Sequence, residues 1–363
     1  MNEDVEMKDE THNQPTTKTT SSTAAAGAAL PLIEKYRPTS LNEIVSHEDI
    51  LSTINLFVER KTIPHFLFHG PPGTGKTSCI LALAHQLYGD TYKSMTLELN
   101  ASDDRGINIV REKIKDFCGA LSSFNTMMAL HNINNTTNTN TNTKTFKLVI
   151  LDEADMMTSA AQFALRRVIE KYTKNVRFCL ICNQVNKIIP AIQSRCMRFR
   201  FGPLNREQCL LRLKDICHRE NIPFTSDDAL RKVINIGKGD MRKILNILES
   251  TFMSFDTITE DNVYSSAGLP TATQVQQMIN QMMDKNKKFG DVYDNLNSFR
   301  IENGFAMGDL IWEITKLIRY NKEISVDVKN KCFKTLKEMD YLDNIGGNEK
   351  IILSNLISLI RNI

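Results

Sequence analysis

A glycine-rich segment restricts the possible folds of this chain more than any other stretch. It reads Gly70-Pro71-Pro72-Gly73-Thr74-Gly75-Lys76-Thr77, follows the apolar run 65–69 and precedes an amphipathic stretch at 76–88. This order fits the G-x-x-x-x-G-K-[ST] phosphate loop, which connects a strand to a helix. A glycine-rich turn without a ligand is the alternative, but the flanking strand and helix patterns disfavour it. The segment predicts a nucleoside triphosphate site.

Each part of this loop has an expected role. The glycines let backbone N–H groups surround phosphate oxygens, and the following helix N-terminus adds partial positive charge. We expect Lys76 to reach the β- and γ-phosphates and the Thr77 hydroxyl to bind Mg²⁺. The residues of this segment expected to contact ATP are Gly70, Pro71, Pro72, Gly73, Thr74, Gly75, Lys76, Thr77 and Ser78.

The composition predicts a soluble globular protein. Of 363 residues 24% are charged, and no apolar run approaches the roughly 18 residues of a membrane span. Residues 1–30 carry five acidic and two basic side chains, so the rest of the chain is mildly basic although the net charge is only +3. This excess is compatible with a nucleic-acid partner but does not argue for one. The acidic start without an apolar segment argues against a transit or secretory signal peptide.

The eight cysteines do not suggest a metal or disulfide framework. Only Cys179 and Cys182 are close, and a three-residue separation within the strand-like run 176–182 sends their side chains to opposite faces. No second Cys-x-x-Cys pair and no histidine pair with zinc spacing completes a site. We expect buried free thiols and a reducing compartment.

The composition divides the chain into a tail and three domains. Residues 1–30 are rich in Thr, Ser, Ala and Asn, and we expect them to be disordered. From 31 to 203, strands alternate with amphipathic stretches, which predicts βαβ crossovers and a parallel sheet. The Asn- and Thr-rich stretch 132–143 is expected to be a surface insertion in this domain. The expected strands are 65–69, 95–99, 146–151, 176–182 and 197–201, and the expected helices are 47–60, 76–88, 106–121 and 158–172.

Strand-like patterns end near residue 203. We expect three short helices, at 206–221, 226–236 and 240–255, in a small helical domain that spans 204–267. From 268 to 363, apolar stripes with helical spacing predict a separate helical bundle, for which we infer a role in assembly. The stripes are Val275, Met278, Ile279 and Met282; Leu310, Ile311, Ile314, Leu317 and Ile318; and Leu353, Leu356, Ile357 and Ile360.

Carboxylates follow the apolar run 146–151. We expect Asp152 to hold Mg²⁺ and Glu153 to orient and polarise an attacking water. Asp155 is expected either to cap the next helix or to take part in a switch. An acidic turn after a buried strand is the alternative, which the phosphate loop disfavours. Adjacent aspartate and glutamate favour a hydrolase over a kinase.

Three further polar residues give weaker signals. Asn183 follows the run 176–182, and it either contacts the γ-phosphate or the attacking water, or forms only a turn. Arg195 is either a surface charge or a finger that completes a neighbour's active site. Arg242 lies in the first turn of a predicted helix, where the helix dipole disfavours a cation, so we expect it to face an anion.

A basic helical face is a candidate DNA surface. Asn108, Arg111 and Lys115 share one face of the predicted helix 106–121, and Arg105 precedes that helix. Such a face suits the phosphate backbone of a duplex, held without base readout. A solvated basic face explains the pattern equally well.

Several motifs occur together and in order. They are Glu34-Lys35-Tyr36-Arg37-Pro38, the phosphate loop, Glu98-Leu99-Asn100-Ala101-Ser102-Asp103-Asp104-Arg105-Gly106-Ile107, Asp152-Glu153-Ala154-Asp155, Ala164-Leu165-Arg166-Arg167, Ser194-Arg195-Cys196 and Gly239-Asp240-Met241-Arg242. This set resembles the small subunits of replication factor C, the eukaryotic sliding-clamp loader of the AAA+ class, over roughly residues 31–255. The sequence departs from the family pattern at Leu32-Ile33, where the family usually has Trp-Val.

The resemblance implies an α/β fold, with an AAA+ P-loop domain built on a parallel sheet, a small helical lid domain and an all-α C-terminal collar domain. It implies ATP and Mg²⁺ as cofactors, with Lys76, Thr77, Asp152 and Glu153 in the roles given above. Asn183 becomes the first sensor and Arg242 the second, and Arg195 becomes a finger that acts in trans on the adjacent subunit's ATP. Tyr36, Arg37 and Pro38 are implied to border the nucleotide.

The resemblance also implies partners. These are the other replication factor C subunits, the sliding clamp PCNA and primer–template DNA, the last contacted through Arg105, Arg111 and Lys115, with no membrane. It implies an ATPase that opens and loads the clamp in the nucleus. Two alternatives remain: a nucleotide-binding structural subunit that donates only Arg195, which the intact Lys76, Asp152 and Glu153 disfavour, and a hexameric AAA+ DNA motor, which the helical C-terminal bundle disfavours.

Overall fold

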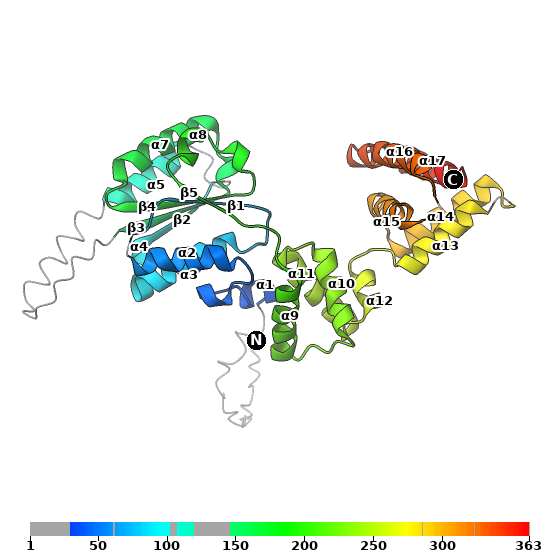
Figure 1. Ribbon diagram of the computed structural model, residues 1–363, viewed down its shortest axis with the longest axis horizontal. Coiled ribbons are helices and arrows are strands. Elements are labelled where there is room, and N and C mark those ends of the chain that lie inside the picture. The colour runs from blue at the N-terminus through cyan, green and yellow to red at the C-terminus, as the bar shows by residue number, and fades with distance from the viewer. Residues whose placement is uncertain are drawn as a thin grey trace, which may run out of the picture.

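The computed structural model describes residues 30–60, 62–101, 107–119, 146–284, 286–322 and 324–362, with only the backbone of 107–111. Nearly all of the predicted disordered tail and the whole of the predicted insertion at 132–143 lie outside these ranges. Three bodies follow one another in Figure 1: a sheet covered by helices, a small group of helices, and a C-terminal group of helices.

The first body is built on five parallel strands in the order β2-β3-β4-β1-β5. This confirms the predicted fold class. Because all strands run the same way, their carboxyl ends meet at one edge, where Asn100 lies beside Asp152 and His69 beside Cys182. The strands are β1 (Phe66–His69), β2 (Thr96–Asn100), β3 (Lys147–Asp152), β4 (Val176–Cys182) and β5 (Met197–Arg200).

Helices cover both faces of the sheet (Figure 1). Helices α5 (Ile107–Gly119), α7 (Ser159–Tyr172) and α8 (Pro190–Gln193) lie on one face, and α2 (Glu48–Glu59), α3 (Lys76–Tyr88) and the short α4 (Tyr92–Met95) lie on the other. Strand residues alternate between the two cores, as a period of two requires. Phe178 and Leu180 enter the α5–α7 core, and Cys179 and Ile181 enter the α2–α3 core.

Four helices form the second body around a single core. They are α9 (Arg206–Glu220), α10 (Asp227–Gly237), α11 (Met241–Phe255) and α12 (Glu260–Ser266). Helix α12 was not predicted from the sequence; it has seven residues, is capped by Thr259 and contributes Val263 to the core. The same core takes up Leu32 of α1 (Leu32–Lys35), so the N-terminal segment packs on this second body.

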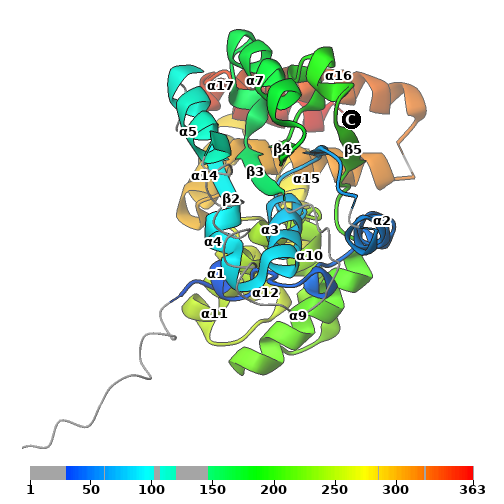
Figure 2. The ribbon, with the colours of Figure 1, turned by 90° about the vertical axis from the view of Figure 1, so that its left-hand side faces the viewer.

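The third body is an all-helical bundle, which Figure 2 shows behind the sheet region. The apolar stripes that predicted it form its core, with Ile279 and Leu317 only partly buried. Its helices are α13 (Ala272–Met283), α14 (Phe289–Asn303), α15 (Met307–Tyr320), α16 (Val326–Asn344) and α17 (Glu349–Arg361).

All eight cysteines are free and buried, as expected. Cys179 and Cys182 lie in the cores on opposite faces of the sheet. Burial raises the pKa of both thiols, that of Cys182 to about 12. Among the described residues, no cluster of His, Cys, Asp and Glu could hold a metal ion, and no helix is long and apolar enough to cross a membrane.

Candidate active site

The phosphate loop connects β1 to α3, as the sequence predicts. Gly73 and Gly75 have positive φ angles of 66° and 90°, a conformation that other residues rarely adopt. Gly70 passes so close to the sheet that a Cβ atom there would lie 2.0 Å from the carbonyl oxygen of Phe201. The loop therefore requires glycine at these positions.

Lys76, the first residue of α3, is buried with 7% of its surface exposed. Its amine donates to the carbonyl oxygens of Gly70 at 2.9 Å and Pro71 at 2.7 Å, and to Asn183 Oδ1 at 3.2 Å. Burial lowers the pKa of Lys76, and the nearby Arg242 acts in the same direction, whereas Asp152 opposes the shift. The structure thus brings together the predicted phosphate-binding lysine and Asn183.

The carboxylates after β3 face the loop. The Thr77 hydroxyl donates to Asp152 Oδ2 at 2.7 Å, and the Glu153 N–H donates to Asp152 Oδ1 at 2.8 Å. The two residues expected to bind Mg²⁺ therefore lie in direct contact. Glu153 has a left-handed backbone, with φ 52°, as the chain turns sharply out of the strand.

Asp155 does not cap the next helix. Thr158 is the N-cap of α7, and its hydroxyl accepts from the Ala161 N–H. Instead, Asp155 Oδ2 accepts from the N–H groups of Asn183 at 3.2 Å and Gln184 at 3.1 Å. The carboxylate thus joins the end of β3 to the segment after β4.

A cavity of about 370 Å³ lies above the loop. One part of its wall is polar and the other is apolar. The predicted residues that line it are Tyr36, Arg37, Pro38, Pro72, Gly73, Thr74, Gly75, Lys76, Thr77, Ser78, Asp152, Glu153, Asn183 and Arg242. Of the residues predicted to contact ATP, Gly70 and Pro71 are not among those lining it, and their carbonyls hold the Lys76 amine instead.

The second body closes one side of this cavity. The Met241 N–H donates to the Gly73 carbonyl oxygen at 3.0 Å. Asp240 caps α11 by accepting from the N–H groups of Arg242 at 2.9 Å and Lys243 at 3.2 Å. Arg242, in the first turn of α11, forms part of the cavity wall.

Tyr36 lines the cavity, but its hydroxyl is engaged elsewhere. It donates to Glu220 at the end of α9, which also pairs with the Lys35 amine at 2.7 Å. Burial and the bond to Glu220 raise the pKa of Tyr36 to about 12. The hydroxyl therefore ties the N-terminal segment to the helices of the second body.

Arg195 does not line the cavity. It lies in the turn between α8 and β5, and its side chain pairs with Glu170 of α7 at 2.6 Å. The sequence left open whether this arginine is a surface charge or acts on a neighbour, and its position outside the lining of this chain's own cavity is compatible with both.

The DNA candidates are described only in part. Arg105 lies outside the described residues, and Arg111 lies on α5 without a described side chain. Lys115 is exposed on the same helix. Their predicted role stays a prediction.

Much of the cavity wall was not predicted from the sequence. Asn100 ends β2 beside Asp152, and the strand-end argument used for Asn183 would have found it. The apolar wall had no sequence signal, because separate segments contribute to it. Its residues include Ile33, Ile44, Val45, Leu204, Ile216, Met241 and Leu245.

The cavity fits a nucleoside triphosphate. Its volume of about 370 Å³ lies within the range of roughly 300–1,000 Å³ that is typical of small-molecule sites. The apolar wall suits a base, and the glycine loop with Lys76 suits phosphates. Thr77 and Asp152 offer the oxygen ligands that Mg²⁺ requires, 2.7 Å apart.

This sheet, phosphate loop, strand-end carboxylates and helical lid define an AAA+ P-loop ATPase. Three family models match the chain in order. They are "DNA polymerase III, delta subunit" at residues 46–205, "RCF1/5-like, AAA+ ATPase lid domain" at 211–253 and "Replication factor C C-terminal domain" at 270–358.

Comparison with individual relatives identifies the family more specifically. It is 46% identical to replication factor C subunit 5 of Homo sapiens, over 91% of each chain. It is 40% identical to replication factor C subunit 3 of Saccharomyces cerevisiae, over 92% of this chain and 93% of the relative. The chain belongs to the family of replication factor C subunits. The chain also matches a RuvB structure from Thermotoga maritima, with 77% of this chain and 91% of the RuvB chain covered, at 13% identity and a TM-score of 0.49.

Proposed function

We propose that this chain is an ATP-hydrolysing subunit of a hetero-oligomeric clamp loader, which opens the sliding clamp PCNA and loads it onto primer–template DNA in the nucleus. One observation carries the proposal. A single cavity contains a phosphate loop, a buried lysine, both strand-end carboxylates, Asn183 and Arg242. A site that only bound nucleotide would not need Glu153 beside Asp152.

The residues of this chain divide the work of the site. Bound MgATP supplies the phosphoryl group and the metal charge that hydrolysis requires. The cationic side chains of Lys76 and Arg242 bind the negatively charged phosphates at one end of the cavity. Thr77 and Asp152 provide the metal ligands. The Glu153 carboxylate orients a water and accepts its proton, and the Asn183 amide fixes the water's direction.

Arg195 lies outside this cavity and serves a different site. We propose that it reaches the phosphates bound by the adjacent subunit, where a second cation stabilises the charge of the transition state. The family membership of this chain supports the proposal, because other replication factor C subunits would supply that neighbour.

The DNA contact is a backbone contact. Lys115 is exposed on α5, and Arg111 follows Asn108 on the same predicted helical face. Such cations hold phosphates without reading bases and weaken with added salt. Together with Arg105 they would bind the primer–template duplex.

Substitution in the reconstituted complex tests these roles separately. Lys76→Ala is expected to abolish ATP binding by this subunit, because the buried amine is its main phosphate contact. Glu153→Gln is expected to keep ATP binding and remove this site's turnover. Arg195→Ala is expected to leave ATP binding by this chain unchanged and to slow turnover at the neighbour's site, roughly 10³- to 10⁵-fold. Labelled-ATP binding and single-turnover hydrolysis measure both quantities.

The outcomes separate the proposal from its rival. Unchanged DNA-stimulated turnover and clamp loading after Lys76→Ala or Glu153→Gln would leave only a structural subunit that donates Arg195. Loss of ATP binding by this chain after Arg195→Ala would show that the arginine acts on its own site.

A further inference from the structure

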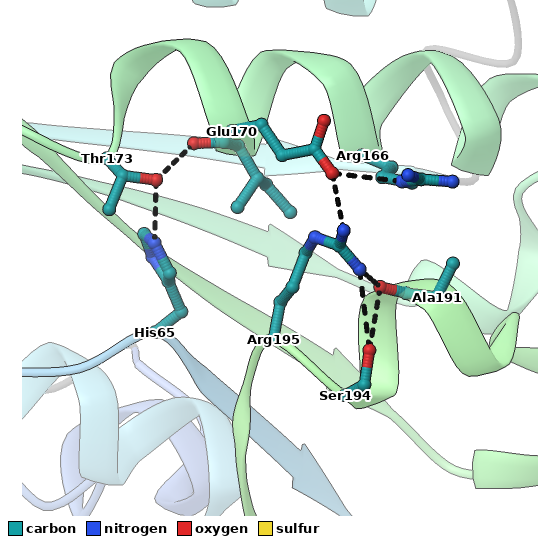
Figure 3. Close-up of polar contacts among 8 residues, drawn as sticks. His65, Arg166, Glu170, Thr173, Ala191, Ser194 and Arg195 are labelled. Carbon is teal, nitrogen blue, oxygen red and sulfur yellow. Dashed lines mark hydrogen bonds and ion pairs between the residues drawn. The ribbon is translucent and has the colours of Figure 1, made fainter.

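Glu170 of α7 holds two arginines, as Figure 3 shows. Its Oε1 atom lies 2.6 Å from Arg195 Nη2 and 3.0 Å from Arg166 Nε. Arg166 lies one turn before Glu170 on the same helix, whereas Arg195 comes from the turn after α8. The carboxylate therefore connects α7 to the turn that carries Arg195.

The guanidinium of Arg195 is held from two sides. Opposite Glu170, its Nη1 atom donates to the Ala191 carbonyl oxygen at 2.6 Å and lies 3.4 Å from Ser194 Oγ. The side chain is only 33% exposed although it lies at the surface. A free arginine side chain samples many rotamers, and these contacts select one.

The helix that carries Glu170 is itself firmly placed. Its inward face contributes Leu165, Val168 and Ile169 to the sheet core. Gln162, on the same helix, is buried, and its Oε1 accepts from the Ile189 N–H at 2.8 Å. Helix α7 and the segment leading to Arg195 thus form one connected unit, and Glu170 lies at its exposed end.

The cluster of Glu170, Arg166 and Arg195 carries a net positive charge. Bonds from Arg166, and then its charge and that of Arg195, keep the pKa of Glu170 below its usual range, so the carboxylate stays ionised. One carboxylate faces two guanidinium groups, and Arg166 offsets the negative charge that would otherwise repel a phosphate. Arginine has five N–H donors. The three acceptors on Arg195 leave donors for phosphate oxygens.

We propose that Glu170 is the positioning residue for Arg195: it fixes the guanidinium in one orientation before the neighbouring subunit's phosphates arrive, and it remains bound to it during hydrolysis. This inference rests on the proposed trans role of Arg195. Charges that are oriented in advance need no reorganisation during the reaction, so they lower its barrier most effectively. Glu170 acts through Arg195 and does not touch the nucleotide.

The test uses the reconstituted complex and defines the Arg195-dependent turnover as the difference between wild type and Arg195→Ala. Glu170→Ala is expected to lower that turnover roughly fivefold to tenfold through kcat, with KM unchanged. Glu170→Gln keeps an acceptor for Nη2 and is expected to lose less. In the Arg195→Ala background, Glu170→Ala is expected to have no further effect, because coupled residues are not additive.

A matched control breaks a different arginine–glutamate pair. Glu207→Ala removes the exposed partner of Arg231 on the second body, where the two charges are 2.9 Å apart. It is expected to leave the Arg195-dependent turnover unchanged. Both alanine variants are expected to keep wild-type thermal stability and subunit composition, since both glutamates are exposed.

Each other outcome overturns the inference. Unchanged or faster turnover after Glu170→Ala would show that the carboxylate does not orient Arg195 or that it restrains it. An equal loss in the Arg195→Ala background would show a role independent of the arginine. If Arg195→Ala itself had no effect, the proposed trans role of Arg195 would be wrong as well. That failure is distinguishable from a failure of the Glu170 inference alone, because it is seen already with Arg195→Ala.

Discussion

Lys76 shows how single residues prepare the site. A buried ammonium without partners would be strongly unfavourable. Two loop carbonyls and Asn183 Oδ1 satisfy it at 2.7–3.2 Å. These acceptors are uncharged, so a phosphate competes with them effectively. The amine is therefore held in place and still able to change partners.

His65, immediately before β1, is expected to make the fold sensitive to acid. Its Nδ1 accepts from the Phe178 N–H at 3.1 Å, so the folded protein requires the neutral ring. Burial, followed by the charge of Arg177, lowers the pKa of His65 to about 4 from its ordinary 6.5. The unfolded state binds the proton more readily, so the contribution is complete above pH 6.5 and is lost as the pH falls towards 4. The full loss is on the order of 3 kcal/mol.

Urea unfolding of the full chain between pH 4 and 7.5 measures this effect. Other groups titrate in the same window, so His65→Asn is the comparison, because it has an acceptor near the position of Nδ1 and no titration. The variant is expected to show a smaller loss of stability on acidification. Parallel curves for both proteins would contradict the role of His65.

At the scale of elements, the start of α11 connects helix capping to the nucleotide site. Asp240 caps the helix, and Met241 donates to Gly73 of the phosphate loop at 3.0 Å. The loop and the cap also lie in close contact, since a Cβ on Gly73 would meet Asp240 Oδ1 at 1.6 Å. One short turn therefore fixes both the helix start and the direction of Arg242.

Asp240→Ala is expected to cost about 1 kcal/mol of stability through the lost cap. It is also expected to weaken ATP binding roughly threefold to tenfold, because Arg242 loses its fixed position. Ser226→Ala is the matched control, since Ser226 caps α10 by accepting from the Ala229 N–H. Thermal unfolding and ATP titration compare the two variants. Equal ATP affinity in both variants would show that the Asp240 cap does not position Arg242 for ATP binding.

At the scale of the whole molecule, a cation–π contact joins the second body to the C-terminal bundle. The Lys238 amine lies 5.0 Å from the centre of the Trp312 ring in α15. Lys238 is the C-cap of α10 and lies two residues before the Asp240 cap, which lies against the phosphate loop. A movement of the second body on nucleotide binding would change this contact.

The chain contains one tryptophan, so its tryptophan fluorescence reports on the surroundings of Trp312, which include Lys238. We expect a non-hydrolysable ATP analogue to change Trp312 emission in the isolated full chain. Lys76→Ala is expected to abolish the change, and Lys238→Met to reduce it. An undiminished change in Lys238→Met would mean that the ring senses something other than the lysine.

Much of the fold was predictable because the relevant signals are local. Runs of alternating or helical period predicted all five strands, the helices at 76–88 and 158–172, and the C-terminal stripes. The short α12 was missed because seven residues show too little periodicity. The phosphate loop was found from its motif, and the carboxylates after β3 were found because parallel strands bring their carboxyl ends to one edge.

The phosphate loop, the strand-end carboxylates and the family could be read from the sequence, because each depends on neighbouring residues in a fixed order. Which distant groups meet depends on the tertiary fold. It paired Tyr36 with Glu220, 184 residues away, and placed Arg195 against Glu170 instead of in this chain's cavity. It also assembled the apolar cavity wall from separate segments. Such pairings depend on how helices pack on a sheet and on each other, and no local pattern encodes that geometry.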